Sequence, residues 1–124
     1  MNRHQLREKI MISIYQSQLL RKDLKETVED NFEAVEQIEE YGRQLIQSVA
    51  DNKERFAEYI NEVLDEWTFD RLGYLEQAIL LLACAEFDCK QLAAQVIMDE
   101  AINLTKKYCD DNTYKLINGV LDRL

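Results

Sequence analysis

The sequence has no proline and only three glycines among its 124 residues. These two residue types interrupt helical hydrogen-bond ladders most readily, so almost nothing in the chain opposes long helices. The chain also lacks any run of about 18 uncharged apolar residues, and its start has no signal-peptide pattern. We therefore expect an all-α protein that is located in the cytoplasm and does not enter a membrane.

Cysteine and histidine are scarce as well. The three cysteines have no C-x-x-C spacing, and the single histidine, His4, is far from them in sequence. Structural zinc sites need four such ligands, usually at short paired spacings, so we expect no metal and no cofactor. Cys84 lies in an apolar run and is predicted to be buried, whereas Cys89 and Cys109 are expected to be partly exposed thiols.

The composition favours a folded domain, because 47% of the residues are hydrophobic and 31% are charged. Disordered chains have too little apolar surface to offset the entropy of ordering. A chain of this size buries roughly two thirds of the surface that its unfolded form exposes. We expect one domain that spans residues 1–124.

Apolar residues recur at three- and four-residue steps, which is the pattern of helices with one buried face. Thr27 with Asp30 resembles a capping box, and Asp51 with Asn52 resembles a second cap, with Trp67 at the end of the buried stripe that follows. The expected helices cover residues 2–20, 27–50, 52–67, 70–87, 93–108 and 112–124.

The segment 70–87 is apolar on nearly every side, so we expect it to be the central helix. Leu19 and Val96 are assigned to the buried faces of their own helices. The predicted fold is a compact bundle of six to seven helices in two three-helix clusters, joined near residues 67–73.

Charge is distributed unevenly along the chain, whose net charge is −9. Residues 1–25 contain six basic and two acidic residues, whereas residues 26–66 contain three basic and thirteen acidic residues. A basic arm on an acidic body can hold a polyanion locally while the body repels it elsewhere. The alternative is a solvated helix start without a ligand.

The acidic residues at four-residue spacing, Glu54, Glu58 and Glu62, are predicted to form a solvated helix face. Acid–base catalysis needs a pocket that raises the pKa of one carboxyl group, and the sequence has no mark of such a pocket. We therefore expect a binding protein and not an enzyme.

Three parts of the sequence resemble the NusB family of transcription antitermination factors. Residues 67–72, 76–83 and 86–87 are similar to the middle of that family, and residues 99–108 are similar to its "NEAVELAK" helix. Residues 116–122 are similar to its "FVNGVLD" ending. The pair Asn118-Gly119 is informative, because it is an unfavourable choice inside a helix that composition alone would not produce readily.

This resemblance implies an RNA-binding antitermination adaptor. Such a protein, with the ribosomal protein NusE, holds single-stranded boxA-type RNA and assists the RNA polymerase antitermination complex, notably in ribosomal RNA operons. Single-stranded RNA is held by basic groups on its phosphates and by aromatic rings on its bases.

The positions in the family's motifs give the expected site residues. Glu76 and Asn112 are expected at the edge that binds the protein partner. Leu116 replaces the family's phenylalanine, which removes one surface for base stacking. The expected RNA-binding residues are Arg3, His4, Arg7, Tyr15, Lys115 and Asn118.

The basic arm is thinner than in the family, because leucine and glutamine interrupt it. About three phosphate contacts give a log–log salt slope of about −2 for single-stranded RNA, so RNA alone should bind weakly and need the ribosomal partner. A second hypothesis is a protein-only helical adaptor or homodimer that has lost RNA binding. NusB-like domains also precede RNA methyltransferases, but this sequence has no glycine-rich nucleotide loop.

Overall fold

The fold consists of six α-helices and two short 3-10 helices, with no strands, in a computed structural model that describes residues 1–124. This confirms the predicted all-α class. None of the helices has the length and apolarity that crossing a membrane requires. The elements are α1 Arg3–Leu20, α2 Leu24–Asn31, η1 Val35–Gln37, α3 Glu40–Val63, η2 Phe69–Arg71, α4 Tyr74–Cys89, α5 Ala94–Tyr108 and α6 Asp111–Arg123.

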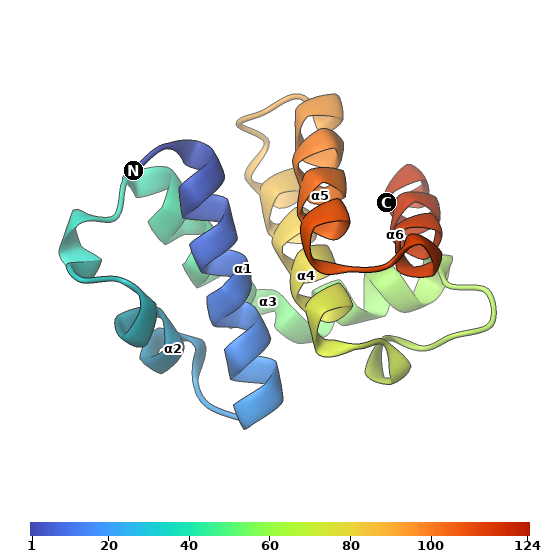
Figure 1. The fold of residues 1–124 in the computed structure, drawn as a ribbon, viewed down its shortest axis with the longest axis horizontal. Coiled ribbons are helices and arrows are strands. Elements are labelled where there is room, and N and C mark those ends of the chain that lie inside the picture. The colour runs from blue at the N-terminus through green and yellow to red at the C-terminus, as the bar shows by residue number, and fades with distance from the viewer.

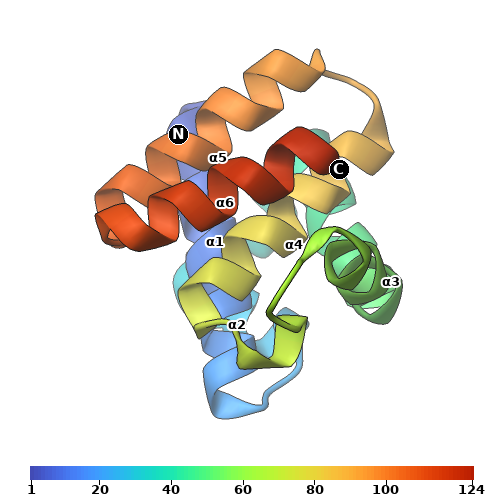
Figure 2. The same cartoon turned by 90° about the vertical axis from the view of Figure 1, so that its right-hand side faces the viewer.

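The helices form two groups of three, α1–α3 and α4–α6, and η2 lies in the connection between them (Figure 1). Helix α4 packs against α1 and α3 on one side and against α5 on the other. Figure 2 shows α5 and α6 side by side across α4. The predicted two-cluster arrangement is therefore confirmed, with α4 as the element that joins the clusters.

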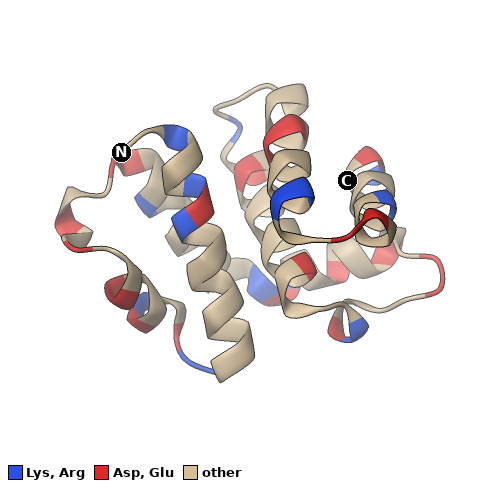
Figure 3. Cartoon of the chain, in the orientation of Figure 1, with Lys and Arg blue, Asp and Glu red and all other residues tan.

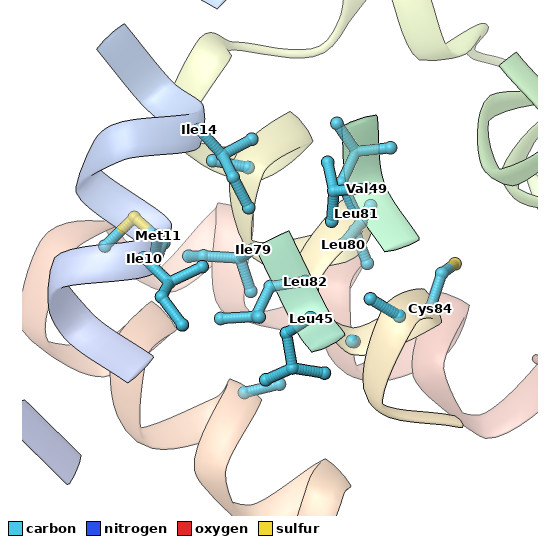
Figure 4. Packing of buried hydrophobic residues seen from close by; sticks show 14 of the residues in the cluster. Ile10, Met11, Ile14, Leu45, Val49, Ile79, Leu80, Leu81, Leu82 and Cys84 are labelled. Atoms are coloured by element: carbon cyan, nitrogen blue, oxygen red, sulfur yellow. The ribbon is translucent and has the colours of Figure 1, made fainter. Parts of the chain in front are cut away.

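Helix α4 is central because every residue from Gln77 to Glu86 is buried. Its leucines and isoleucine meet Ile10, Met11 and Ile14 of α1 and Leu45 of α3 in one core (Figure 4). Such burial stabilises the fold by about 1.5–3 kcal/mol for each large aliphatic side chain.

The predicted thiols also lie as expected. Cys84 is buried in this core, and burial raises the pKa of its thiol to about 12. Cys89 and Cys109 are half-buried.

The predicted boundary between the second and third helices is wrong. Helix α3 runs without interruption through Asp51 and Asn52, because their side chains bond within the helix, to Gln47 and to the Ser48 carbonyl respectively. Thr27 caps no helix either. It is buried inside α2, where its hydroxyl donates to the Ser13 carbonyl of α1 at 2.8 Å.

Three apolar residues that helical periodicity predicts to be buried are exposed. Trp67 lies in the loop after α3 and is 50% exposed, because the chain turns to extended backbone at Leu64. Leu19 lies near the end of α1 and Val96 near the start of α5, and these side chains are 44% and 43% exposed. Helical periodicity gives the direction of a side chain, but not where the covering helix stops.

Two glycines differ in the space around them. A Cβ atom at Gly42 would lie 2.9 Å from Ile38 Cγ2 and 3.0 Å from Leu6 Cδ1, whereas one at Gly119 would have no neighbour within 4 Å. We expect Gly42→Ala to lower the free energy of unfolding by about 1–3 kcal/mol through overpacking. Gly119→Ala should raise it by up to about 1 kcal/mol through helix propensity. Urea unfolding measures both changes, and a gain for Gly42→Ala would contradict the close α1–α3 approach.

Candidate functional site

A buried ion pair lies where the start of α1 meets α4. Arg7 Nε donates to Glu86 Oε1 at 2.7 Å, and the two side chains are only 5% and 3% exposed. The Tyr41 hydroxyl of α3 donates to the other Glu86 oxygen at 3.1 Å, and Glu100 of α5 lies 3.8 Å from Arg7 Nη1. Four helices therefore contribute to one polar cluster inside the core.

Burial by itself lowers the pKa of Arg7, but the hydrogen bond and the charge of Glu86 outweigh it and leave this pKa raised. Burial and the charge of Glu86 raise the pKa of Tyr41. Both groups therefore keep their protons, and Arg7 stays cationic beside Glu86. The expected phosphate contact of Arg7 is corrected, because a guanidinium that is held in the core has no surface to offer RNA.

Arg3 and His4 remain at the surface, one turn before Arg7. Arg3 Nε donates to Glu39 at 2.8 Å, and its guanidinium carbon lies 4.2 Å from the centroid of the Tyr41 ring. His4 Nδ1 lies 2.8 Å from Glu100 Oε2. Arg3 and His4 thus each contact a carboxylate. These are Glu39, which precedes α3, and Glu100 of α5.

The first half of α1 also contacts α5 through Glu8, which accepts hydrogen bonds from Lys107 Nζ at 2.8 Å and from the Tyr108 hydroxyl. These bonds lower the pKa of Glu8. Tyr15 lies seven residues later on the same helix face and is half-buried, packed against the hydrophobic core.

The start of α4 meets the start of α6, and this contact forms the α4–α6 corner. The Thr113 hydroxyl donates to Glu76 Oε1 at 3.4 Å, and the neighbouring Asn112 is exposed. Lys115 is exposed one turn further along α6, and Asn118 is half-buried. The structure therefore brings the expected partner-binding residues and Lys115 together at one end of the molecule.

Arg3 and His4 are not part of that corner. Arg3 precedes Tyr15 by twelve residues of helix, which is about 18 Å along its axis. The expected residues are thus spread over the molecule from the start of α1 to α6. An extended ligand can reach residues this far apart, whereas a compact small molecule cannot.

A groove beside Lys115 was not predicted from the sequence. It has a volume of about 330 Å³ and lies between the loop after α3 and α6. Trp67 lines it, and the Arg71 guanidinium lies 5.6 Å from the Trp67 ring centroid. No sequence signal pointed to this groove, because Trp67 continues the apolar stripe of a helix that in the structure ends at Val63.

The buried ion pair makes a clear stability prediction. Arg7→Met and Glu86→Leu should each lower the free energy of unfolding by about 3–5 kcal/mol, because each leaves a buried charge without its partner. The double variant should lose less than either single variant, since it leaves neither charge. Urea unfolding of the four proteins measures this, and additive losses would show that the two side chains do not act as a pair.

Known proteins match the chain over nearly its whole length. The model of the NusB family matches residues 4–124. The "Transcription antitermination protein NusB" of Bacillus subtilis is 30% identical over 125 residues, which cover 100% of this chain and 95% of that protein. The protein of the same name from Synechococcus elongatus is 37% identical over 89 residues, which cover 72% of this chain but only 42% of that relative.

Two solved structures share the fold. NusB of T. maritima superposes with a TM-score of 0.88 at 27% identity, covering 99% of this chain and 89% of that one. A structure of the antitermination factors NusB and NusE in complex with dsRNA gives a TM-score of 0.83 at 27% identity, covering 98% of this chain and 96% of that one. Sequence motifs, helix arrangement and these matches agree, and the chain belongs to the NusB family.

Proposed function

We propose that this chain is an RNA-binding transcription antitermination factor. With NusE it holds boxA-type single-stranded RNA, and it promotes read-through by RNA polymerase, notably in ribosomal RNA operons. The observation that carries the proposal is the likeness along 98% of the chain to the NusB of a complex with NusE and dsRNA. The exposed residues Arg3, His4 and Lys115 supply the chemistry that such a ligand needs.

Phosphate contacts are assigned to the exposed side chains of Arg3, His4 and Lys115. The first two are paired with Glu39 and Glu100, so a phosphate must compete with carboxylates for them. This competition and the net charge of −9 keep RNA binding weak when the chain is alone.

Base stacking is assigned to Trp67, whose ring is half exposed beside Lys115 in the same groove. A ring next to a cation is the usual arrangement for holding a single-stranded nucleotide, since the base stacks while the phosphate is neutralised. The Arg71 guanidinium over the ring adds a second cation at this point. Trp67 thus takes the stacking role that Leu116 cannot fill.

The NusE surface is assigned to the α4–α6 corner, which holds Glu76 and Asn112. Tyr15 stays an expected RNA-binding residue. The second half of α1, residues 10–20, carries no charge (Figure 3), and Leu19 is exposed one turn after Tyr15. Tyr74 is 41% exposed beside Glu76. An uncharged surface with aromatic rings and a few polar groups is the usual composition of a protein interface.

The second candidate function is a protein-only adaptor or homodimer without RNA binding. The pairing of Arg3 and His4 with carboxylates favours it, because a phosphate would have to displace Glu39 and Glu100. Titration of boxA-like and scrambled single-stranded RNA, with and without NusE and at several salt concentrations, separates the two. Equal affinity for both RNAs in the presence of NusE would contradict the antitermination proposal.

The groove gives the sharpest test of the RNA contact. We expect Trp67→Ala to weaken boxA RNA binding by about 1–3 kcal/mol, the usual contribution of one stacked base. Lys115→Ala should reduce the salt slope by about 0.7, which corresponds to one phosphate. Both side chains are exposed, so unfolding by urea should change little. Lys53→Ala on the acidic body is the matched control and should leave affinity and salt slope unchanged.

A further inference from the structure

The side chain of Arg3 is held in one orientation by a buried aromatic ring and by an exposed carboxylate. Its guanidinium lies over the face of the Tyr41 ring, 4.2 Å from the centroid, and its Nε donates to Glu39 at 2.8 Å. Tyr41 is only 3% exposed, so its buried ring gives the guanidinium a fixed surface to stack on.

The Tyr41 side chain is itself held in the core. The Tyr41 hydroxyl donates to Glu86 Oε2 at 3.1 Å, while the other oxygen of Glu86 accepts from Arg7 at 2.7 Å. All three side chains are buried. The Tyr41 ring is therefore held by its own burial, and its hydroxyl also contacts the ion pair that joins α1 to α4.

The restrained guanidinium keeps one edge free. Only Nε of Arg3 makes a hydrogen bond to the protein, and both Nη atoms have no protein partner. The stack fixes the plane of the group, and the Glu39 bond fixes its rotation within that plane. The free edge carries two parallel N–H donors, which is the arrangement that matches two oxygens of one phosphate.

Preorganisation of this kind favours binding because a free arginine side chain loses much rotamer freedom when it is ordered. Here that loss has already occurred on folding. A lysine at the same place could supply the charge but neither the planar stack nor the paired donors.

We propose that Tyr41 is a positioning residue for RNA binding, acting through Arg3. Arg3 then presents two parallel N–H donors that are already oriented, a preformed fork, to one RNA phosphate. The proposal rests on the RNA-binding function proposed above. Tyr41 touches no RNA, because its ring is covered by Arg3 and its hydroxyl is held by Glu86. The substitution that matters is therefore loss of the ring and not loss of the hydroxyl.

The test compares boxA RNA affinity and its salt dependence for the full chain with NusE present. Tyr41→Leu removes the ring but keeps an apolar side chain, and we expect affinity to fall about threefold to tenfold and the salt slope to fall by about 0.7, as for Arg3→Ala. Tyr41→Phe keeps the ring and should bind RNA within about twofold of wild type, although it loses the Glu86 hydrogen bond.

A double-mutant cycle separates positioning from a merely structural role. In the Arg3→Ala background, Tyr41→Leu should cause no further loss of affinity, because the group that it positions is already absent. An equal loss in both backgrounds, or an unchanged affinity and slope for a folded Tyr41→Leu protein, would overturn the proposal.

Arg3→Lys tests the same idea at an exposed position, should Tyr41→Leu fail to fold. A preformed fork predicts that Arg3→Lys loses affinity about threefold or more, whereas Lys53→Arg on the acidic body is the control without effect. Wild-type affinity for Arg3→Lys would overturn the fork but leave the RNA-binding function standing. If the wild-type chain with NusE binds no boxA RNA, the proposed function fails, and this inference fails with it.

Discussion

The burial of α4 on all sides is the constraint on which the rest of the structure depends. Ten consecutive side chains of this helix, from Gln77 to Glu86, are inaccessible to solvent, so the other helices must surround it. Helices α1 and α3 cover one side and α5 covers the other. No smaller set of helices could bury both sides of α4, and the two clusters are consequently a single packed unit around one core.

Two polar side chains end the buried run of α4, and each lies beneath one of the candidate surfaces. At one end Glu86 binds Arg7 and Tyr41, below Arg3 and His4. At the other end Gln77 donates to the carbonyls of Phe69 and Leu72 and accepts from Gln18. Because a buried polar group must be satisfied, these bonds fix how the basic arm and the α4–α6 corner are placed relative to the core.

We expect the charge distribution of the molecule to orient a bound nucleic acid more than to attract it. A net charge of −9 repels nucleic acid in general, and the cations of the arm are opposed by Glu39 and Glu100. For the proposed RNA-binding function, affinity must then come from a few well-placed contacts and from the proposed partner protein, not from a broad basic surface. Two members that each bind weakly can hold a ligand well when they are joined in one assembly.

The helical class, the central position of α4 and the family follow from the sequence alone, because they depend on missing prolines, apolar periodicity and ordered motifs. The sequence also predicted Arg3 and Lys115 as binding residues, and both are exposed. The burial of Arg7, the continuation of α3 past Asp51 and the exposure of Trp67 beside Lys115 are visible only in the tertiary structure. Helical periodicity is a local property, whereas burial depends on where a distant helix begins and ends. Arg7 faces the core because Glu86, 79 residues later, is there to neutralise it.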